Sequence, residues 1–429
     1  MRRTRTALMA SALAVATGIG GFLAVTQTAN AASGGLPAHV FAPYVEAWTG
    51  ENIATLAQQS GDKYLTMAFL QTAAASEPCT AYWNGHTDQP IASSTFGSDI
   101  AAIRAKGGDV VPSFGGYTAD STGTEIADSC TNVDSIAQQF EKLITTYNIT
   151  RIDLDVEVDS LTNSAGIDRR NKAIKKTEDL AAANGRTIQF VYTLPSTTHG
   201  LEASGIAVLQ SALDNNARID IVNMMTFDYY DNASHQMAND TKTAAAGLVA
   251  QLDELYKHTR TQAQLWAMVG ITEMIGVDDF GPAETFTTAD APVVEKWAAQ
   301  QGIAMLSFWA LQRDNGNCPG GAASDSCSGV SQTQWQFSKA FQPFTSGTTS
   351  PAPSPSPSAT KPPSPSPSPS GSPSPSPTGS PSAQAWAPNK PYTVGQVVTY
   401  GGKRYSCRQA HTSLVGWEPP NVPALWLAL

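Results

Sequence analysis

Between residues 39 and 341, short apolar runs alternate with stretches in which apolar residues recur about every 3.6 positions. The apolar runs predict strands at 39–48, 63–70, 109–115, 151–157, 187–194, 219–228, 264–271 and 303–309. The intervening stretches predict helices at 51–60, 99–106, 133–147, 167–183, 204–216, 241–258, 289–301 and 331–341. Eight strand–helix units in succession are typical of an α/β fold whose parallel strands close into a (β/α)8, or TIM, barrel. A doubly wound open sheet is the alternative, and the count of eight strands disfavours it.

The fourth predicted strand, 151–157, has only acidic residues at its polar positions. Ile152, Leu154, Val156 and the following Val158 form one side of the alternation, and Asp153, Asp155, Glu157 and the following Asp159 form the other. Residues two apart on a strand share a face and lie about 6.5 Å apart. Carboxylates this close raise one another's pKa, so that one of them stays protonated near neutral pH, as a general acid must.

A surface strand with an acidic outer face is the alternative interpretation of 151–157. Such strands usually also contain Lys, Thr or Ser, and this one does not. Glu157 stands at the carboxyl end of the predicted strand, which is where TIM barrels place their catalytic residues. The position therefore favours a catalytic site.

Residues 1–31 are predicted to be a signal peptide. Three arginines precede an apolar run, and Ala29-Asn30-Ala31 forms a small-residue cleavage site. A membrane anchor is the alternative, but Gly18, Gly20 and Gly21 interrupt the run. The mature protein is thus expected to be secreted, without a membrane span. Loss of the three arginines takes the net charge from −10 to −13, which does not suit binding to nucleic acid or to an anionic membrane.

Export makes disulfides possible for the five cysteines. Cys318 and Cys327 flank a short Gly/Ser loop and are one expected pair, and Cys79 and Cys130, both in predicted loops, are the other. Cys407 lies in a different domain and is expected to be a buried thiol outside both disulfides. The six histidines show no spacing typical of a metal site, and no glycine loop for nucleotides is present, so neither a metal nor a cofactor is expected.

The composition changes after the predicted barrel domain, 32–344. Residues 345–382 are dominated by Pro-Ser repeats and predict an extended spacer of about 3 Å per residue. Residues 383–429 predict a small all-β module with a hairpin at Gly401-Gly402. Its six aromatic residues exceed what so small a core needs, so some are expected to be exposed and to suit the flat faces of sugar rings. They are Trp386, Tyr392, Tyr400, Tyr405, Trp417 and Trp426.

Four motifs in the predicted barrel resemble those of family 18 glycoside hydrolases. The stretch from Thr150 to Glu157 is similar to the signature Asp-x-x-Asp-x-Asp-x-Glu, with Thr150 in place of the first acid and Val156 where an aromatic is common. The other three are Ser113-Phe114-Gly115-Gly116 on strand three, Met225-Thr226-Phe227-Asp228 on strand six and Trp309 at the end of strand eight. The C-terminal module resembles chitin-binding modules of families 5 and 12, through Trp386, Tyr392, Trp417-Glu418-Pro419 and Trp426.

The resemblance implies a chitinase in which the acetamido oxygen of the substrate attacks C1 and forms an oxazolinium ion. Glu157 would be the general acid and then the base, Asp155 would orient the acetamido group, and Asp153 would share a proton with Asp155. The remaining substrate contacts implied by the resemblance are Asp228, Tyr229, Met225, Trp309, Tyr44 and Gly115. Phe227 replaces the tyrosine that donates to the acetamido oxygen, and Tyr229 or Tyr230 is expected to substitute for it. In the module, Trp417, Pro419 and Tyr405 would contact chitin, with Trp417 the main contact.

Two other functions remain open at this point. One is a lectin-like relative without activity, although such relatives typically lack the acid that Glu157 supplies. The other is the same chemistry on peptidoglycan or on N-glycan cores.

Only about thirty residues separate predicted strands seven and eight, which leaves no room for the α+β insertion that walls the cleft in some relatives. An open cleft and endo-acting cleavage of chitin or chito-oligosaccharides are therefore expected. A monomeric state is also expected.

Overall fold

A computed structural model describes residues 35–231, 233–346, 384–387, 390–408, 411–413, 418–420 and 425–429. The chain separates into two compact units, Met1–Ser354 and Pro355–Leu429, each of which is considered by itself. The predicted signal peptide and nearly all of the predicted linker lie outside the described residues. No helix among the described residues is both long and apolar enough to cross a membrane.

The first unit is a barrel whose wall has eight parallel strand positions, called staves, and this confirms the predicted fold. The staves are β1 and β2 together (Val40–Phe41 and Tyr44–Glu46), β3 (Tyr64–Thr72), β5 (Asp109–Gly115), β6 (Arg151–Asp155), β7 (Gln189–Thr197), β9 (Ile221–Met225), β10 (Val269–Met274) and β13 (Met305–Trp309). Their order is β1-β13-β10-β9-β7-β6-β5-β3-β2, and every neighbouring pair is parallel. Because β1 and β2 follow each other in the chain and stand at opposite ends of this order, the sheet closes on itself.

The first stave is two short strands, not the single strand predicted for 39–48. Pro43 separates them and has no N–H to donate to the ladder. The Ala42 N–H still donates to Leu306 on β13, whereas the Pro43 carbonyl accepts from Thr66 on β3. The chain thus changes its hydrogen-bonding partner at Pro43, and this change closes the barrel.

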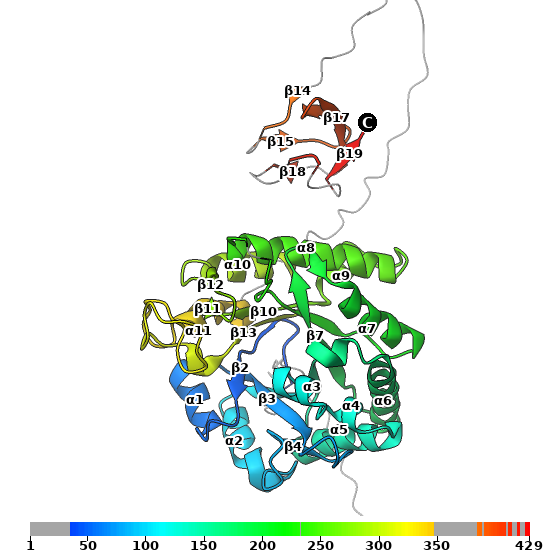
Figure 1. Ribbon diagram of the computed structural model, residues 1–429, viewed down its shortest axis with the longest axis vertical. Helices are drawn as coiled ribbons and strands as arrows, with labels where there is room; N and C mark the ends of the chain where they lie inside the picture. The colour runs from blue at the N-terminus through cyan, green and yellow to red at the C-terminus, as the bar shows by residue number, and fades with distance from the viewer. Residues whose placement is uncertain are drawn as a thin grey trace, which may run out of the picture. The chain divides into compact units, whose positions relative to one another are not determined.

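Helices surround the staves as an outer ring (Figure 1). The longer ones are α1 (Ile53–Ser60), α2 (Ser93–Ala105), α5 (Val133–Tyr147), α6 (Ser164–Ala183), α7 (Ala203–Asp214), α8 (Met237–Leu255) and α10 (Ala291–Gln301). The shorter ones are α3 (Tyr117–Thr122), α4 (Ile126–Ser129), α9 (Gln262–Trp266), α11 (Gln336–Phe341), α12 (Pro343–Ser346) and the 3₁₀ turns η1 (Val158–Leu161) and η2 (Leu311–Arg313). Helix α5 has the predicted bounds because Asn132 caps its first turn and Asn148 ends it in the left-handed conformation.

The prediction of a strand from residue 264 was wrong. Gln262–Trp266 is the short helix α9, whose first turn is closed by a capping box between Thr261 and Gln264. Strand β10 starts only at Val269. A short apolar run fits a strand or a buried helical turn equally well, and the capping box decided for the helix.

Short antiparallel additions decorate the barrel. Strands β11 (Gly276–Asp278) and β12 (Gly281–Phe286) form a hairpin between β10 and α10, in a stretch predicted to hold no element before the helix. Strand β4 (Ala81–Trp83) pairs with β3, and β8 (Gly200–Leu201) pairs with β7.

Both predicted disulfides, Cys79–Cys130 and Cys318–Cys327, are formed.

The second unit is a small β structure, as predicted. Its strands are β14 (Gln384–Ala385), β15 (Pro391–Tyr392), β16 (Val397–Tyr400), β17 (Lys403–Cys407), β18 (His411–Thr412) and β19 (Trp426–Ala428). Strands β16 and β17 form the predicted hairpin around Gly401 and Gly402. Its buried core consists of Tyr392, Val398, Tyr405, Cys407 and Trp426.

Candidate active site

The acidic positions of β6 face the interior of the barrel and not the solvent. Asp153 is fully buried and Asp155 is 5% exposed, while Ile152 and Leu154 belong to the core between the barrel and its helices. The predicted alternation is therefore present, but both faces of the strand are buried. Strand β6 ends at Asp155, so that Glu157 lies two residues beyond the strand instead of on it.

Asp153 is an acceptor held by hydroxyl groups from three other staves. Its Oδ2 accepts from Tyr44 (2.9 Å) and Ser113 (2.6 Å), and its Oδ1 accepts from Thr193 (2.6 Å). Burial raises the pKa of Asp153 to about 6. The hydrogen bonds from Ser113, Thr193 and Tyr44 act in the opposite direction and limit this rise. Asp153 is thus ionised at neutral pH and ties β6 to the surrounding strands.

Asp155 has the opposite environment. Its Oδ1 is buried and makes no hydrogen bond with any part of the chain that the structure describes. Burial, followed by the charges of Glu157 and Asp153, raises the pKa of Asp155 well above its usual range. A buried polar atom without a partner is costly, so this oxygen is suited to receive a donor from a bound molecule.

Glu157 is partly exposed at the mouth of the barrel. Burial of its carboxyl group and the charges of Asp228 and Asp279 raise its pKa to about 7, although a hydrogen bond from the Tyr117 backbone acts against them. A carboxylic acid that is half protonated at neutral pH can deliver a proton and take one back within one reaction cycle.

Asp228 follows β9 and faces the same opening. Its backbone is left-handed, with φ of +52°, and its N–H donates to Asp278 on the β11–β12 hairpin at 3.2 Å. Burial and the neighbouring Asp279 raise the pKa of Asp228 to about 7. Its Oδ1 is buried and has no hydrogen-bond partner among the described residues, which leaves a second acceptor for a ligand.

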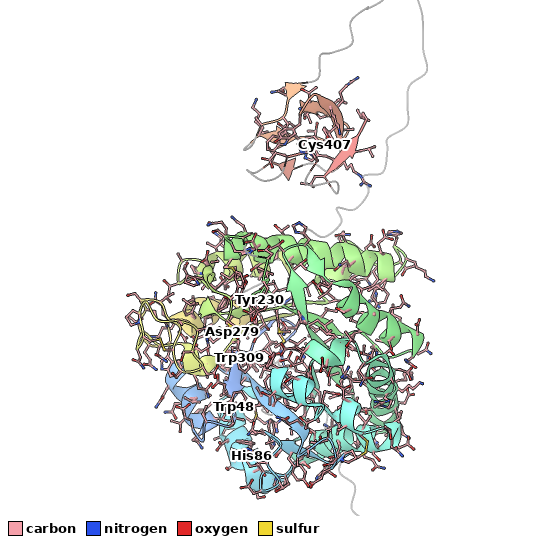
Figure 2. The ribbon with its side chains drawn as sticks, in the orientation of Figure 1. Trp48, His86, Tyr230, Asp279, Trp309 and Cys407 are labelled. Carbon is pink, nitrogen blue, oxygen red and sulfur yellow. A yellow bond between two sulfur atoms is a disulfide. The ribbon has the colours of Figure 1, made fainter. Side chains whose placement is uncertain are left out.

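Aromatic rings form a continuous platform beside these acids. The ring centroid of Trp309 lies 5.6 Å from that of Phe69, with the two rings nearly parallel. It lies 5.8 Å from the ring centroid of Tyr44 and 6.0 Å from that of Trp48. Trp309 is partly exposed and Trp48 is 40% exposed. Figure 2 shows Tyr230, Asp279, Trp309 and Trp48 following one another across the middle of the ring of helices. The sequence had identified Trp309 and Tyr44; Phe69 and Trp48 were missed because nothing in their own segments sets them apart from core aromatics.

Gly115 and Met225 occupy positions that shape the site. A Cβ on Gly115, whose φ is +97°, would lie 2.0 Å from the Asp155 carbonyl oxygen, so glycine is needed for β5 to approach β6. Met225 is 7% exposed, and its carbonyl oxygen accepts from Ser196 at 2.7 Å. Contact of either residue with substrate stays a prediction.

Tyr229 and Tyr230 differ in direction. The Tyr229 hydroxyl is buried, and the carboxylates that act on its pKa are Glu273, Asp240, Glu284 and Asp278, which do not include the acids of β6. Tyr230 is 58% exposed and packs against Phe280, and its pKa is raised by burial and next by the charge of Asp228. The geometry therefore favours Tyr230 over Tyr229 as the tyrosine near Asp228.

The chain is similar in sequence to known protein families. A sequence profile described as "Glycosyl hydrolases family 18" matches residues 40–336. The chain belongs to this family. A second profile, "Carbohydrate-binding module family 5/12", matches residues 385–427 and accounts for the second unit.

Two relatives of this family 18 protein match more than half of the chain. The "Probable bifunctional chitinase/lysozyme" of Escherichia coli (strain K12) is 34% identical over 324 residues, which are 72% of this chain and 35% of that protein. "Endochitinase 11" of Metarhizium anisopliae is 34% identical over 290 residues, which are 65% of this chain and 53% of that protein. The chain thus spans about a third and about half of these relatives. The crystal structure of the catalytic domain of a hyperthermophilic chitinase from Pyrococcus furiosus superposes with a TM-score of 0.63 at 28% identity, covering 73% of this chain and 97% of that domain.

Folding also gathers Asp231, His235 and Glu284, whose potential metal-ligating atoms lie within 4.8 Å of one another. The spacing of the histidines had not indicated this group. The two ring nitrogens of His235 lie 2.9 Å from Asp231 and 3.1 Å from Asp240, and Glu284 accepts the backbone N–H of Tyr229 at 2.8 Å. Because Glu284 accepts backbone N–H groups of this loop and His235 bonds to Asp231 and Asp240, the group braces the loop after β9 that carries the site residues.

The predicted contact residues of the module differ in burial, and one of them is not described. Trp417 lies outside the described residues. Tyr405 and Pro419 are buried, and Tyr405 is part of the module's core, so neither residue has the exposure expected of a chitin contact. Trp386 and Tyr400 instead pack edge to face at 5.5 Å, with Tyr400 37% exposed, and form the aromatic surface of the described part of the module.

The pKa of Glu157 sets an expectation for the pH dependence of this family 18 site. Glu157 acts as an acid only when protonated, so the rate should fall as pH rises through about 7, and not near the ordinary value of 4.5. Asp279 is exposed and helps to raise this pKa. Asp279→Asn should therefore move the alkaline limb of kcat/KM to lower pH by up to about one unit. Initial rates on a soluble oligosaccharide, measured across pH for the wild type and for Asp279→Asn, give the alkaline limb of each enzyme. A limb that stays in place or moves to higher pH in the variant would contradict the assignment of the limb to Glu157.

Proposed function

We propose that this protein is a secreted chitinase that cleaves β-1,4 bonds between N-acetylglucosamine units with retention of configuration. The observation that carries the proposal is the pair formed by Asp155, with its unpartnered buried oxygen, and Glu157, with its pKa of about 7. The printed names of the relatives, chitinase and endochitinase, agree with it.

The proposed mechanism is substrate-assisted. Glu157 protonates the glycosidic oxygen while the substrate's acetamido oxygen attacks C1, so the leaving sugar departs and an oxazolinium ion forms. The acetamido N–H donates to the unpartnered Oδ1 of Asp155, which orients the group and faces the developing positive charge. Glu157, now ionised, accepts a proton from the incoming water, which opens the ring at C1. Trp309 supports the sugar at the cleavage point, and Tyr230 is the proposed donor to the acetamido oxygen.

The decisive experiment compares three substrates. Release of reducing sugar should be seen with colloidal chitin and should be much slower with bacterial cell walls and with a high-mannose glycoprotein. Proton NMR of the first product should show the β anomer, and a substrate without the N-acetyl group at the cleaved unit should not be hydrolysed. Faster hydrolysis of cell walls than of chitin would favour a lysozyme activity, which the name of one relative includes. An α anomer as first product would exclude the proposed mechanism.

Endo-acting cleavage is proposed from the limited size of the wall beside the site. Between β10 and α10 the chain forms only the β11–β12 hairpin, Gly276–Phe286, and no larger insertion. A chain held on few sides can bind internally and leave after each cut. The viscosity of a soluble chitin derivative should then fall before much reducing sugar appears. Reducing ends that rise while viscosity holds would show cleavage from chain ends.

Secretion is proposed from the sequence of residues 1–31 and agrees with the two disulfides, which form in oxidising compartments. Cleavage after Ala31 predicts that the exported protein begins at Ala32. N-terminal sequencing of the protein from culture medium tests this.

The module is proposed to hold the enzyme on insoluble chitin, which raises its local concentration there. Trp417→Ala should weaken binding to insoluble chitin about tenfold, as loss of a central aromatic contact does, and should slow hydrolysis of solid chitin but not of soluble oligomers. Leu427→Ala is the matched control, because Leu427 is a 53% exposed apolar residue of the same module without a ring. Equal binding by both variants and the wild type would move the contact to Trp386 and Tyr400.

A further inference from the structure

The polypeptide leaves the barrel just before the general acid, at the point where the strand ladder stops. The Val156 N–H still donates to the Thr193 carbonyl of β7, but Glu157 is past the last strand residue. Glu157 is extended, with φ of −129° and ψ of −177°, and the 3₁₀ turn η1 begins at Val158. An N–H at such a place has no ladder partner, and a buried N–H left without one is costly.

A side chain from α3 supplies the missing partner. Asp120 is 1% exposed, and its Oδ2 accepts the Glu157 N–H at 2.5 Å. Helix α3 is itself tied to β6, because the Gly116 N–H donates to the Asp155 carbonyl at 3.1 Å and the Asp120 N–H donates to the Gly116 carbonyl at 3.0 Å. Gly116 cannot be replaced, since φ is +85° and a Cβ would lie 2.6 Å from the ring of Phe69. Asp120 therefore has a defined position relative to both Asp155 and Glu157.

The surroundings of Asp120 indicate in which form it acts. Its Oδ1 is buried and has no hydrogen-bond partner within the described residues. Burial and the charge of Glu125 raise its pKa to about 9, although Arg170, paired with Glu125 at 2.9 Å, opposes them. Asp120 is thus a neutral acid at neutral pH. It can accept from the Glu157 backbone through Oδ2 without adding a negative charge beside the group that must stay protonated.

We propose that Asp120 is a positioning residue for the general acid: by holding the backbone N–H of Glu157 it sets the place and direction of the Glu157 carboxyl group beyond the end of β6. The inference rests on the proposed role of Glu157 in glycoside hydrolysis. Nothing in the segment around Asp120 distinguishes it in sequence from other helix-terminal aspartates. Its role arises because the loop after β5 folds over the end of β6.

Kinetics of the full-length enzyme test the proposal with three variants. Asp120→Ala removes the acceptor and should lower kcat about a hundredfold with KM changed less than about threefold, as expected for a misplaced acid. Asp120→Asn keeps an acceptor oxygen and a neutral group of the same size, and should restore kcat to within about fivefold of wild type. Asp128→Ala is the matched control: Asp128 holds η1 and the start of α6 through Ser160 and Asn163, but does not contact Glu157.

The pH profile separates positioning from a merely structural effect. The groups that act on the pKa of Glu157 are Asp228, Asp279 and the backbone of Tyr117, and Asp155 neighbours it on the chain. In Asp120→Ala, a carboxyl group released into solvent should lose part of its desolvation, so the alkaline limb should move below its wild-type place near pH 7. Asp120→Asn and Asp128→Ala should leave the limb in place. An Asp120→Ala variant within about threefold of wild type, or an Asp120→Asn variant as inactive as the alanine variant, overturns the proposal.

One measurement does not depend on activity or on whether Asp120→Ala folds. In wild-type enzyme labelled with 15N-glutamate, the Glu157 amide signal is the one that is missing from the Glu157→Gln variant. Its proton should exchange slowly with solvent. In Asp120→Asn it should stay protected, because the amide oxygen still accepts the Glu157 N–H. A rapidly exchanging Glu157 amide in the wild type overturns the proposal. Failure of the proposed function would instead appear as an inactive wild type in which this amide is protected.

Discussion

Glu157→Gln is expected to reduce hydrolysis of chito-oligosaccharides by about a thousandfold or more while leaving the fold intact. The amide has the size of the acid but cannot give a proton to the leaving sugar or accept one from water. The loss should be smaller for cleavage of an aryl glycoside whose leaving group departs without protonation. Single-turnover rates with both substrates measure this difference, and thermal unfolding and oligosaccharide binding should match the wild type.

Asp159→Asn is the control for Glu157→Gln. Asp159 continues the same acidic alternation, but it is exposed on η1, and its substitution should change the rate less than about twofold. Turnover by Glu157→Gln close to that of wild type, or equal losses on the natural and the activated substrate, would show that another group is the acid.

Asp155→Asn is expected to lower kcat by about two to three orders of magnitude, the range seen when one preorganised electrostatic group is lost at a developing charge. The buried Oδ1 of Asp155 has no partner in the described part of the protein, so its proposed partner is the acetamido N–H of the substrate. An amide at this position has no ionisable proton, so it cannot supply a negative charge opposite the oxazolinium ion. KM should change much less than kcat, because the contact strengthens as the positive charge develops.

Asp153→Asn provides the contrast. Three hydroxyl donors converge on Asp153, and an amide nitrogen placed there would face at least one of them without being able to accept. This variant should therefore lose more thermal stability than Asp155→Asn. A change of less than about twofold in kcat for Asp155→Asn would remove Asp155 from the reaction.

Much of the molecule could be predicted from local patterns in the sequence. Eight strand–helix units predicted the barrel, since each unit has its own period and length, and the predicted bounds of α5 agree with its capping residues Asn132 and Asn148. Spacing and loop position also predicted the two disulfides. The alternation in 151–157 placed Asp153 and Asp155 on a common face. These features depend on residues close together in the chain, where backbone geometry alone determines which side chains share a side.

Other features depend on contacts between distant segments. The acids of β6 share one face because of the local geometry of a strand, but closure of the barrel places this face in the interior. There burial raises the pKa of Asp155, and three other strands supply hydroxyl groups to Asp153. Likewise, the pattern identified Glu157 as an acid, whereas the fold of α3 over the end of β6 decided that Asp120 holds its backbone. The division follows from physics: the alternation is set by neighbouring residues, while desolvation and hydrogen-bond geometry depend on every segment that packs around the group.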